Sequence, residues 1–345
     1  MSETIRLTQF SHGSGCGCKI APAVLDEILK DSGTTLLPDS NLLVGNETKD
    51  DAAVYNLGNG TALISTVDFF MPIVDDAFAY GQIAAANALS DVYAMGGKPF
   101  LAIAVLGWPT EKIPATVARE VMRGAKQKCS EAGVTLAGGH TIDSPEPFFG
   151  LAVNGMVSVS GLKKNSTAIT GDLLFITKPI GTGIISTALK RSLITEEQAQ
   201  DAVQYMSTLN LFGAELGKYD YVHALTDVTG FGLLGHLIEM CEGAGVSAEI
   251  EYVKVPLMGN VKDLAAKFVY ADNTMRNWKS YEAKVQGIGS ESLLTLCDPQ
   301  TSGGLLIAVA KDKQNEFAQL CGANDVTAVC IGSITEKKEK AITIL

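Results

Sequence analysis

The spacing of apolar residues becomes regular from about Asn41 and changes between two periods along the chain. Residues Asp51–Asn56 and Thr61–Thr66 run apolar or alternate with polar positions around a Gly58-Asn59-Gly60 turn, which predicts a β-hairpin. Longer stretches with helical periodicity then follow, separated by short apolar runs typical of buried strands. This part of the chain is predicted to form helices at Ala79–Met95 and Pro114–Ala132 and strands at Pro99–Leu106, Val134–Ala137 and Phe148–Val157.

The segment Lys163–Thr167 is polar, charged and without a period, and we interpret it as a linker. Regular elements resume after it, and their mixture predicts an α+β fold with antiparallel strands. The two halves are similar in length and element order, without a clean sequence repeat. The second half is predicted to form strands at Leu173–Lys178, Ala248–Tyr252, Leu305–Val309 and Thr327–Ile334, and helices at Thr182–Leu189, Glu196–Lys218, Phe231–Ala244 and Lys313–Cys321.

The first 40 residues carry little hydrophobic pattern. A short helix is predicted at Ala21–Leu29, opened by Pro22, and the Gly-, Ser- and Cys-rich stretch before it is expected to be mobile. A chain of 345 residues is long enough for two domains. We therefore expect an N-terminal loop and short helix over residues 1–40, one domain over 41–162 and a second over 163–345.

The charge of the chain argues against one class of partner. Its formal net charge is −11, and an acidic surface repels a polyphosphate backbone, so we expect no binding of nucleic acid. A nucleotide is still compatible with this charge, because carboxylates can hold metal ions that make the local field positive.

Compartment and membrane association are predicted from apolar runs and cysteines. The longest uncharged runs, Ala52–Val67 and Pro147–Leu162, are broken by Gly, Asn or Pro and are shorter than a membrane span. The first ten residues lack the apolar region of a signal peptide. Seven cysteines, an odd number at irregular spacing, suit a reducing compartment, so we expect a cytoplasmic protein without a membrane partner.

The segment SHGSGCGCK, Ser11–Lys19, is the first candidate for chemistry. Glycines alternate around Cys16 and Cys18, and a lysine next to a thiol favours the reactive thiolate, so Cys16 could act as a nucleophile and Lys19 as a phosphate ligand. Two other interpretations remain open: a flexible tail with incidental cysteines, or a zinc site formed by His12, Cys16 and Cys18. The segment also resembles a Walker A loop, but Cys18 and Ile20 stand where Gly and Ser or Thr belong, so it is not a P-loop.

Aspartates at the ends of predicted elements form the second candidate. Asp91 interrupts an Ala-rich helix, and Asn87 lies four residues before it, so both side chains project from one helix face. Mg²⁺ prefers oxygen ligands and usually takes a few carboxylates together with substrate phosphates. Any single aspartate at a strand end could instead cap a turn. The group that together predicts a metal site comprises Asp50, Asp51, Asp68, Asp91 and Asp227.

Three glycine-containing segments have less specific patterns. Gly138-Gly139-His140-Thr141 follows a predicted strand and could bring backbone amides to an anion, or form a plain turn. Gly230–Gly235 spells G-x-G-x-x-G at the start of a helix, but its late position and the preceding Asp227 argue against a dinucleotide site. Cys297–Gly304 is a polar loop that could line a site, although a turn explains it equally well.

Taken together, these segments closely resemble the selenophosphate synthetase family over nearly the whole chain. GCGCK and LTDVTGFGLLGH are the most specific matches, and NETKDDAAVY, AANALSDVYAMGGKP, AGGHTID and CDPQTSGGLL occur in the family's order. The wider superfamily includes aminoimidazole ribonucleotide synthetase and thiamine-monophosphate kinase. It shares the fold and the aspartates but is not expected to share the N-terminal Cys/Lys loop.

The resemblance implies a fold, a reaction and partners. The fold would be two PurM-like α+β domains, with mixed or antiparallel sheets flanked by helices, a flexible Gly-rich N-terminal loop, and a homodimer joined through N-terminal strands. The reaction would convert ATP, selenide and water to selenophosphate, AMP and phosphate, for selenocysteine and selenouridine synthesis. The cofactors would be several Mg²⁺ ions and K⁺, and a selenium-delivery protein would be a further partner.

The resemblance also assigns roles to individual residues. Cys16 occupies the family position taken by Cys or selenocysteine, and it could carry selenium covalently or only position it. By the same resemblance, the catalytic residues are Cys16 and Lys19; the nucleotide contacts are Lys19, Thr48, Lys49, Asp50, Asp68, Asp91, Gly139, His140 and Thr141; and the metal ligands are Asp51, Asp91 and Asp227.

Rival functions are compatible with parts of this pattern. One is another ATP-dependent synthetase or kinase of the same superfamily, acting on a small nitrogenous substrate. A second is a non-catalytic thiol or zinc-binding regulator, and a third is an NAD-binding oxidoreductase.

Overall fold

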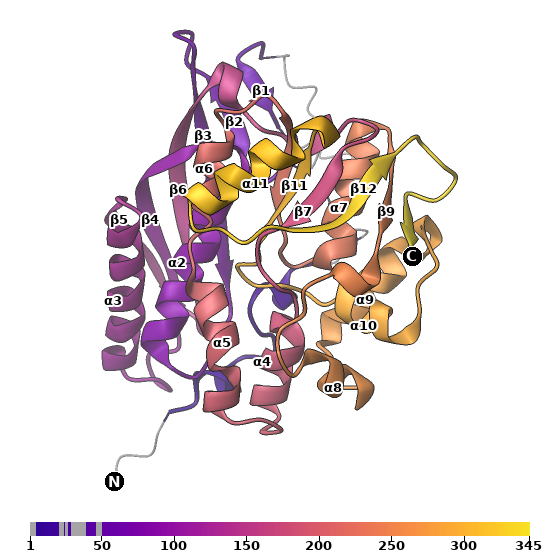
Figure 1. Ribbon diagram of the computed structural model, residues 1–345. Helices are drawn as coiled ribbons and strands as arrows, with labels where there is room; N and C mark the ends of the chain where they lie inside the picture. Colours follow the sequence, from indigo (N-terminus) through magenta and orange to yellow (C-terminus); the bar gives the residue numbers. More distant parts are fainter. Residues whose placement is uncertain (1–4, 21–23, 25–26, 29–38, 46–49) are drawn as a thin grey trace.

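A computed structural model describes residues 5–20, 24, 27–28, 39–45 and 50–345 of the chain. Two β-sheets and the helices packed between and around them make up the molecule (Figure 1). Of the helix predicted at Ala21–Leu29, residues 24, 27 and 28 are described, and these are helical. No helix in the described ranges is both long and apolar enough to cross a membrane.

The first sheet has six strands in the order β1-β2-β3-β6-β4-β5. All neighbouring strands are antiparallel except β4 and β5, which are parallel. The alternation of apolar and polar residues in β3 turns Phe70 toward the helices and Phe69 away from them. The strands are β1 (Leu42–Val44), β2 (Ala53–Asn56), β3 (Thr61–Phe70), β4 (Lys98–Trp108), β5 (Thr135–Asp143) and β6 (Phe148–Ser158).

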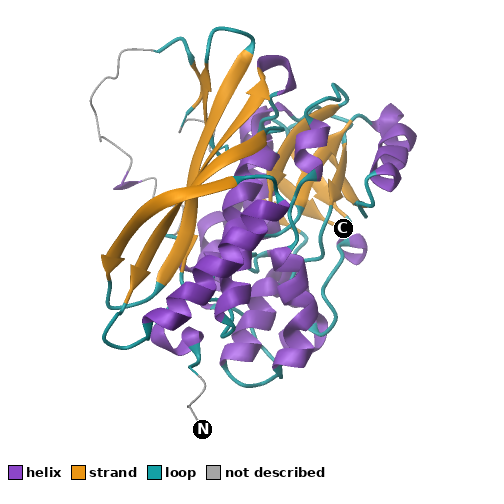
Figure 2. Cartoon of the chain, turned by 90° about the vertical axis from the view of Figure 1, so that its left-hand side faces the viewer, coloured by secondary structure: helices purple, strands orange, loops and turns teal. Residues whose placement is uncertain are grey.

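One face of this sheet carries helices, whereas the described residues place no long helix on the other, which we call the bare face (Figure 2). Helices α2 (Ala77–Ala94) and α3 (Ala115–Glu131) cover the packed face. They approach closely because glycines lie at the crossing: a Cβ atom on Gly81 or Gly124 would collide with the backbone of the other helix. The bare face leaves large apolar side chains about half exposed, namely Val67, Phe69, Phe100, Ile103 and Ile142.

Helix α2 is buried on nearly all sides because it lies between the first sheet and elements of the second half. It begins at Asp76, whose carboxylate accepts a hydrogen bond of 2.6 Å from the backbone N–H of Ala79. Its alanines allow close packing all around, as in a core helix. The polar residues Asn87, Ser90 and Asp91 are therefore held in the centre of the molecule.

The second sheet has seven strands in the order β10-β13-β9-β12-β7-β11-β8. Its pairs are antiparallel except β10 with β13 and β13 with β9. The strands are β7 (Leu173–Ile176), β8 (Val222–Asp227), β9 (Ser247–Ile250), β10 (Val285–Gln286), β11 (Leu305–Val309), β12 (Val329–Thr335) and β13 (Ile342–Ile344). The helices are α4 (Thr182–Lys190), α5 (Glu196–Ser207), α6 (Phe212–Leu216), α7 (Gly232–Ala244), α8 (Val261–Ala266), α9 (Asp272–Tyr281), α10 (Ser290–Leu296) and α11 (Gln314–Ala323).

Two expectations about secondary structure were wrong in detail. The helix predicted at Glu196–Lys218 is two helices, α5 and α6, because the chain turns at Thr208 and the side chain of Asn210 binds inward, to Ser90 Oγ and Gly303 O at 2.8 Å each. The strand predicted at Val134–Ala137 continues to Asp143. The segment predicted as a linker, Lys163–Thr167, packs against the second half, where Lys163 Nζ donates to the carbonyls of Tyr219 and Val222 at 2.8 and 2.9 Å.

Several short elements were not predicted. These are β1, β8, β10, β13, α8, α9 and α10. They have few residues each, and their burial depends on contacts with distant segments, such as the parallel pairing of β13 with β9 and β10. A local hydrophobic period is too short in such segments to identify the element.

Candidate active site

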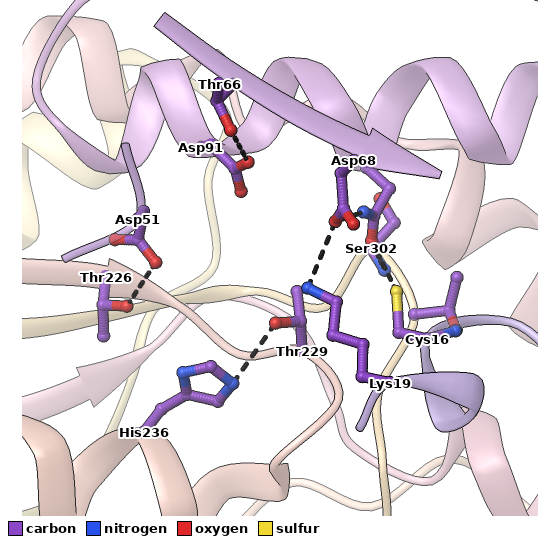
Figure 3. A network of polar contacts seen from close by, with 12 residues as sticks. Cys16, Lys19, Asp51, Thr66, Asp68, Asp91, Thr226, Thr229, His236 and Ser302 are labelled. Atoms are coloured by element: carbon purple, nitrogen blue, oxygen red, sulfur yellow. Dashed lines mark hydrogen bonds and ion pairs between the residues drawn. The ribbon is translucent and has the colours of Figure 1, made fainter. Parts of the chain in front are cut away.

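Five segments that are distant in sequence meet beside the middle of α2 (Figure 3). They are the N-terminal segment with Cys16 and Lys19, the residues before β2 with Asp51, the end of β3 with Asp68, the end of β8 with Thr226 and Asp227, and the loop at 297–304. Most of the predicted catalytic and metal-binding side chains therefore lie around one space. The residues of the loop at 297–304 were left undecided by the sequence, and the structure places them in this site.

Cys16 is fully buried in a docked N-terminal segment. The N–H of Gly15 donates to Met71 O at 3.0 Å, and the N–H of Cys16 donates to Thr301 Oγ1 at 2.9 Å. Gly15 has φ +52°, and a Cβ atom there would collide with Thr301 and Ile73. The segment expected to be mobile is thus seated in the structure, with its backbone fixed on both sides of the thiol.

The docked segment also explains one glycine of the G-x-G-x-x-G pattern. A Cβ atom on Gly230 would lie 2.7 Å from Cys16 O and 3.3 Å from Lys19 Cδ. The strand before the pattern, β8, is an edge strand antiparallel to β11, so the pattern does not follow a strand of a parallel βαβ unit. Gly230 therefore makes room for the N-terminal segment, and the dinucleotide hypothesis gains no support.

Asn87 joins Cys16 to Asp68. Its Oδ1 accepts from the N–H of Ser302 at 2.7 Å and from Cys16 Sγ at 3.2 Å, and its Nδ2 donates to Asp68 Oδ2 at 2.5 Å. A backbone donor on one side and a carboxylate on the other fix the orientation of the amide. Cys16 is then the donor toward Oδ1, an arrangement that favours the protonated thiol.

Lys19 acts on the same network from the other side. Its Nζ lies 3.4 Å from Asp68 Oδ2. Burial alone would lower the pKa of Lys19, but the charges of Asp68, Cys16, Asp91 and Asp227 outweigh burial and raise this pKa, so the ammonium stays charged. The positive charge favours a thiolate at Cys16, in opposition to the hydrogen bond with Asn87. A change in the contacts of Asn87 or Lys19 would shift this balance.

The three predicted metal ligands lie close enough to repel one another. Burial raises the pKa of Asp51, Asp91 and Asp227, and the charge of Asp227 raises the pKa of Asp51 and Asp91 further. Thr226 Oγ1 donates to Asp51 Oδ1 at 2.9 Å, and Thr66 Oγ1 donates to Asp91 Oδ2 at 2.6 Å. Within the described ranges, Asp51 Oδ2 and Asp227 Oδ2 are buried without a hydrogen-bond partner.

These carboxylates fit a hard cation. Buried acceptor oxygens without donors, held among like charges, are stabilised by a divalent ion. In the part of the chain that the structure describes, no three Asp, Glu, His or Cys side chains are grouped closely enough to hold an ion by themselves. An ion here would therefore also need oxygens from a substrate, which is the usual arrangement for Mg²⁺.

The zinc hypothesis gains no support from the geometry of His12 and Cys16. The imidazole of His12 is 76% exposed and its Nδ1 lies 2.8 Å from a carboxylate oxygen of Glu146, whereas Cys16 is buried against Asn87. The side chain of Cys18 lies outside the described residues. His12 and Cys16 therefore point in different directions.

The remaining predicted nucleotide contacts lie in two separate segments, residues 48–50 and residues 139–141. Thr48 and Lys49 lie outside the described residues, and Asp50 Oδ1 accepts from the N–H of Asn165 at 2.8 Å. Gly139, His140 and Thr141 lie within β5 and not in a turn after it, so the expectation of a post-strand anion loop was wrong.

The position of β5 keeps these residues away from Asp68. Strand register aligns Asp68 with Leu151, Leu151 with Ala104, and Ala104 with Gly139. Three strand spacings, roughly 14 Å, therefore separate Gly139 from Asp68 in one chain. The structure brings together the Cys16, Lys19 and aspartate part of the predicted site but not its Gly139–Thr141 part.

Comparison with known proteins identifies the family. Residues 49–157 match the family described as "AIR synthase related protein, N-terminal domain", and residues 170–344 match "AIR synthase related protein, C-terminal domain". A selenide, water dikinase of Pseudomonas putida is 51% identical over 345 residues, which cover 100% of both chains. One from Shewanella putrefaciens is 51% identical over 100% of this chain and 98% of its own. The chain belongs to the selenide, water dikinase family.

The fold of this selenide, water dikinase family member is shared more widely. A thiamine monophosphate kinase from Aquifex aeolicus has a TM-score of 0.67 and 18% identity, covering 93% of this chain and 96% of its own. The hydrogenase maturation protein HypE, in complex with ATP, has a TM-score of 0.64 and 18% identity over 86% and 85% of the two chains. The expected α+β fold of two PurM-like domains and the resemblance to the selenophosphate synthetase family are both confirmed.

Proposed function

We propose that this chain is a selenophosphate synthetase that converts ATP, selenide and water to selenophosphate, AMP and orthophosphate. The observation that carries the proposal is the continuous contact from Cys16 through Asn87 and Asp68 to Lys19. This contact places a chalcogen side chain next to a charged ammonium and close to a group of buried carboxylates, in which Asp51 Oδ2 and Asp227 Oδ2 have no hydrogen-bond donor among the described residues. The product would serve selenocysteine and selenouridine synthesis.

In this proposal the carboxylates hold the nucleotide through metal ions. Asp51, Asp91 and Asp227 would bind Mg²⁺, and their repulsion gives the binding its driving force. When bound, Mg²⁺ supplies the positive charge that neutralises phosphate oxygens as a phosphoryl group is transferred. Lys19 and Asp68 would orient the phosphates next to Cys16, with Thr48, Lys49 and Asp50 as further nucleotide contacts and K⁺ as an additional cofactor.

The N-terminal segment would act as a lid over this site. Lys190 Nζ from α4 donates to the carbonyls of Ser11 and Gly13, at 2.9 and 3.4 Å, and so holds the segment down. Asp75 holds its start through Arg6 and Thr8, at 2.8 and 2.6 Å. Closure would keep bulk water away from the phosphoryl group and present Cys16 to selenide.

The reaction can be tested directly with the purified protein. With ATP, Mg²⁺ and selenide under anaerobic conditions, ³¹P NMR should show selenophosphate and AMP in equal amounts. The same mixture without selenide is the control and should form no selenophosphate. ATP consumed to ADP, or no selenide-dependent product, would contradict the proposal and favour another kinase or synthetase of the superfamily.

We further propose a cytoplasmic location and a selenium-delivery protein as partner, since free selenide is readily oxidised.

We also propose that the protein is a homodimer joined through the bare face and edge of the first sheet. An exposed face bearing Val67, Phe69 and Phe100 resembles an uncovered core more than a solvent surface. The distance of Gly139 from Asp68 within one chain adds a second argument. If Gly139–Thr141 contact the nucleotide, a second copy must bring this segment to the aspartates.

Substituting Phe69 by glutamate should weaken the dimer. Phe69 is 47% exposed, and its ring lies 5.4 Å from that of Phe148, so a carboxylate there would be buried in both copies at the interface. We expect the dimer dissociation constant to rise by about a hundredfold or more, measured by sedimentation equilibrium. Leu193→Glu is the matched control, because Leu193 is 56% exposed and lies in the loop between α4 and α5, outside this sheet. An unchanged Phe69→Glu dimer would place the interface elsewhere.

A further inference from the structure

A large cavity is lined in part by Lys178, whose side chain contacts the loop at 297–304. Its volume is about 1610 Å³, and it is bordered by α5, α6, the end of β7 and the loops at 256–259 and 324–327. Ligand sites commonly have volumes of roughly 300–1,000 Å³, so this space is ample for a small molecule. Among the described residues, neither Cys16 nor Lys19 nor the three predicted metal ligands line it.

Lys178 is the feature of the cavity wall that suggests a ligand. Its side chain is buried, 5% exposed, and Nζ donates to the carbonyls of Thr208 and Ser302 at 2.7 and 2.9 Å. None of the carboxylates in the described ranges forms an ion pair with it. Burial lowers the pKa of Lys178 to about 7, against the attraction of Asp227. A buried ammonium with two carbonyl acceptors retains one N–H and a positive charge for a ligand.

A series of hydrogen bonds connects the cavity to the candidate active site. Lys178 binds the carbonyl of Ser302, the N–H of Ser302 binds Asn87, and Asn87 binds Cys16 Sγ. Ser302 makes both contacts in a left-handed conformation with φ +49°, which is uncommon for a residue other than glycine. A second connection starts at Asn210, which lines the cavity and donates to Ser90 Oγ at 2.8 Å.

The charges around the cavity limit what it can hold. Three lysines line it, Lys98, Lys178 and Lys218, against four carboxylates, Asp201, Glu215, Asp220 and Asp325. Lys218 is already paired with Glu215. A polyphosphate would meet more negative than positive charge, whereas an anion of one charge needs only Lys178.

We propose that this cavity is a binding site for a small, singly charged inorganic anion, held by the ammonium of Lys178 behind the loop that contacts Cys16. The inference rests on the proposed function, because hydroselenide and dihydrogen phosphate, a substrate and a product of that reaction, both belong to this class. The anion supplies the counter-charge that Lys178 lacks. Through Ser302 and Asn87, its binding is coupled to the position of the Cys16 thiol.

The test follows the ionisation of Lys178 in the full-length protein. With ¹³C-labelled lysine, the Cε resonance of Lys178 is assigned by its loss in Lys178→Met and titrated across neutral pH. Potassium phosphate and, anaerobically, sodium hydroselenide are the probes, with sodium gluconate at equal ionic strength as control. The titration midpoint should rise by about one unit with a binding anion, corresponding to tenfold tighter binding to the ammonium than to the neutral amine.

The outcomes separate this inference from the proposed function. A shift with hydroselenide alone assigns the site to the substrate, and one with phosphate alone assigns it to the product. No shift with either anion, or a shift abolished by Lys98→Met at the exposed part of the same cavity, overturns the site even if selenophosphate is formed. A Lys178-dependent shift in a protein that makes no selenophosphate leaves the anion site standing while the proposed function fails.

Discussion

Replacing Cys16 by serine is expected to abolish selenophosphate formation while nucleotide binding persists. Serine keeps the size and the donor, so the hydrogen bond to Asn87 Oδ1 can still form and the N-terminal segment can still dock. Its hydroxyl is far less acidic and less polarisable than a thiol, so it is a poor nucleophile and a poor partner for selenide. We expect the rate of product formation, followed by ³¹P NMR, to fall by at least about a thousandfold.

The matched control for this variant is Cys129→Ser. Cys129 is also buried, but it lies in α3, away from the site, and burial raises the pKa of its thiol to about 11. Its replacement should cost stability without changing the rate of product formation at saturating substrate. Isothermal titration of both variants with ATP and Mg²⁺ separates loss of chemistry from loss of binding. If Cys16→Ser formed product at a tenth of the normal rate or faster, the thiol would have no chemical role.

Replacing both Asp51 and Asp227 by asparagine is expected to weaken Mg²⁺-dependent nucleotide binding by about a hundredfold or more. The same substitutions should raise the melting temperature of the metal-free protein. Burial raises the pKa of both carboxylates, and the charge of Asp227 raises the pKa of Asp51 further, so their ionisation opposes folding near neutral pH. Asparagine keeps the shape and removes the charge, and the two effects therefore have opposite signs.

The expected dependence of the melting temperature on pH follows from the direction of these pKa shifts. A carboxyl group whose pKa is raised by folding stabilises the protein fully below its unfolded pKa of about 4, and this stabilisation is lost as pH rises through the folded pKa. The metal-free wild-type protein should therefore lose melting temperature on going from mildly acidic to neutral pH more steeply than the double variant. Asp312→Asn, at an exposed position, is the control and should match the wild type. Equal pH profiles for all three proteins would contradict the mutual repulsion of Asp51 and Asp227.

The elements that the sequence predicted best are those whose burial is decided locally. Helix α2 and strand β6 have a largely apolar pattern, and both lie close to their predicted ranges, Ala79–Met95 and Phe148–Val157. The break between α5 and α6 was missed because it depends on Asn210 reaching Ser90, which lies 120 residues away in sequence. Hydrophobic periodicity carries no information about such a distant hydrogen bond.

The candidate site also contains residues that the sequence predicted and residues whose role depends on contacts with distant segments. The residue types at Cys16, Lys19 and the aspartates indicated their chemistry, because a lysine beside a thiol favours the thiolate and Mg²⁺ prefers carboxylate oxygens. Thr301 and Ser302 act mainly through backbone and hydroxyl contacts, for which almost any turn residue would look the same in sequence. The Gly139–Thr141 segment was misplaced because an exposed edge strand has no alternating pattern to mark its length.

The close contact of Gly15 with Thr301 and Ile73 decides whether the whole N-terminal segment can dock. The space available at this point is smaller than one methyl group, so any side chain added there would prop the segment open. Docking of the N-terminal segment can therefore be separated from the reactive groups. A variant that cannot dock this segment would still carry the thiol, the ammonium and the carboxylates. Alanine at this position would make a wedge, and with it the open form of the enzyme could be isolated with every reactive group still in place.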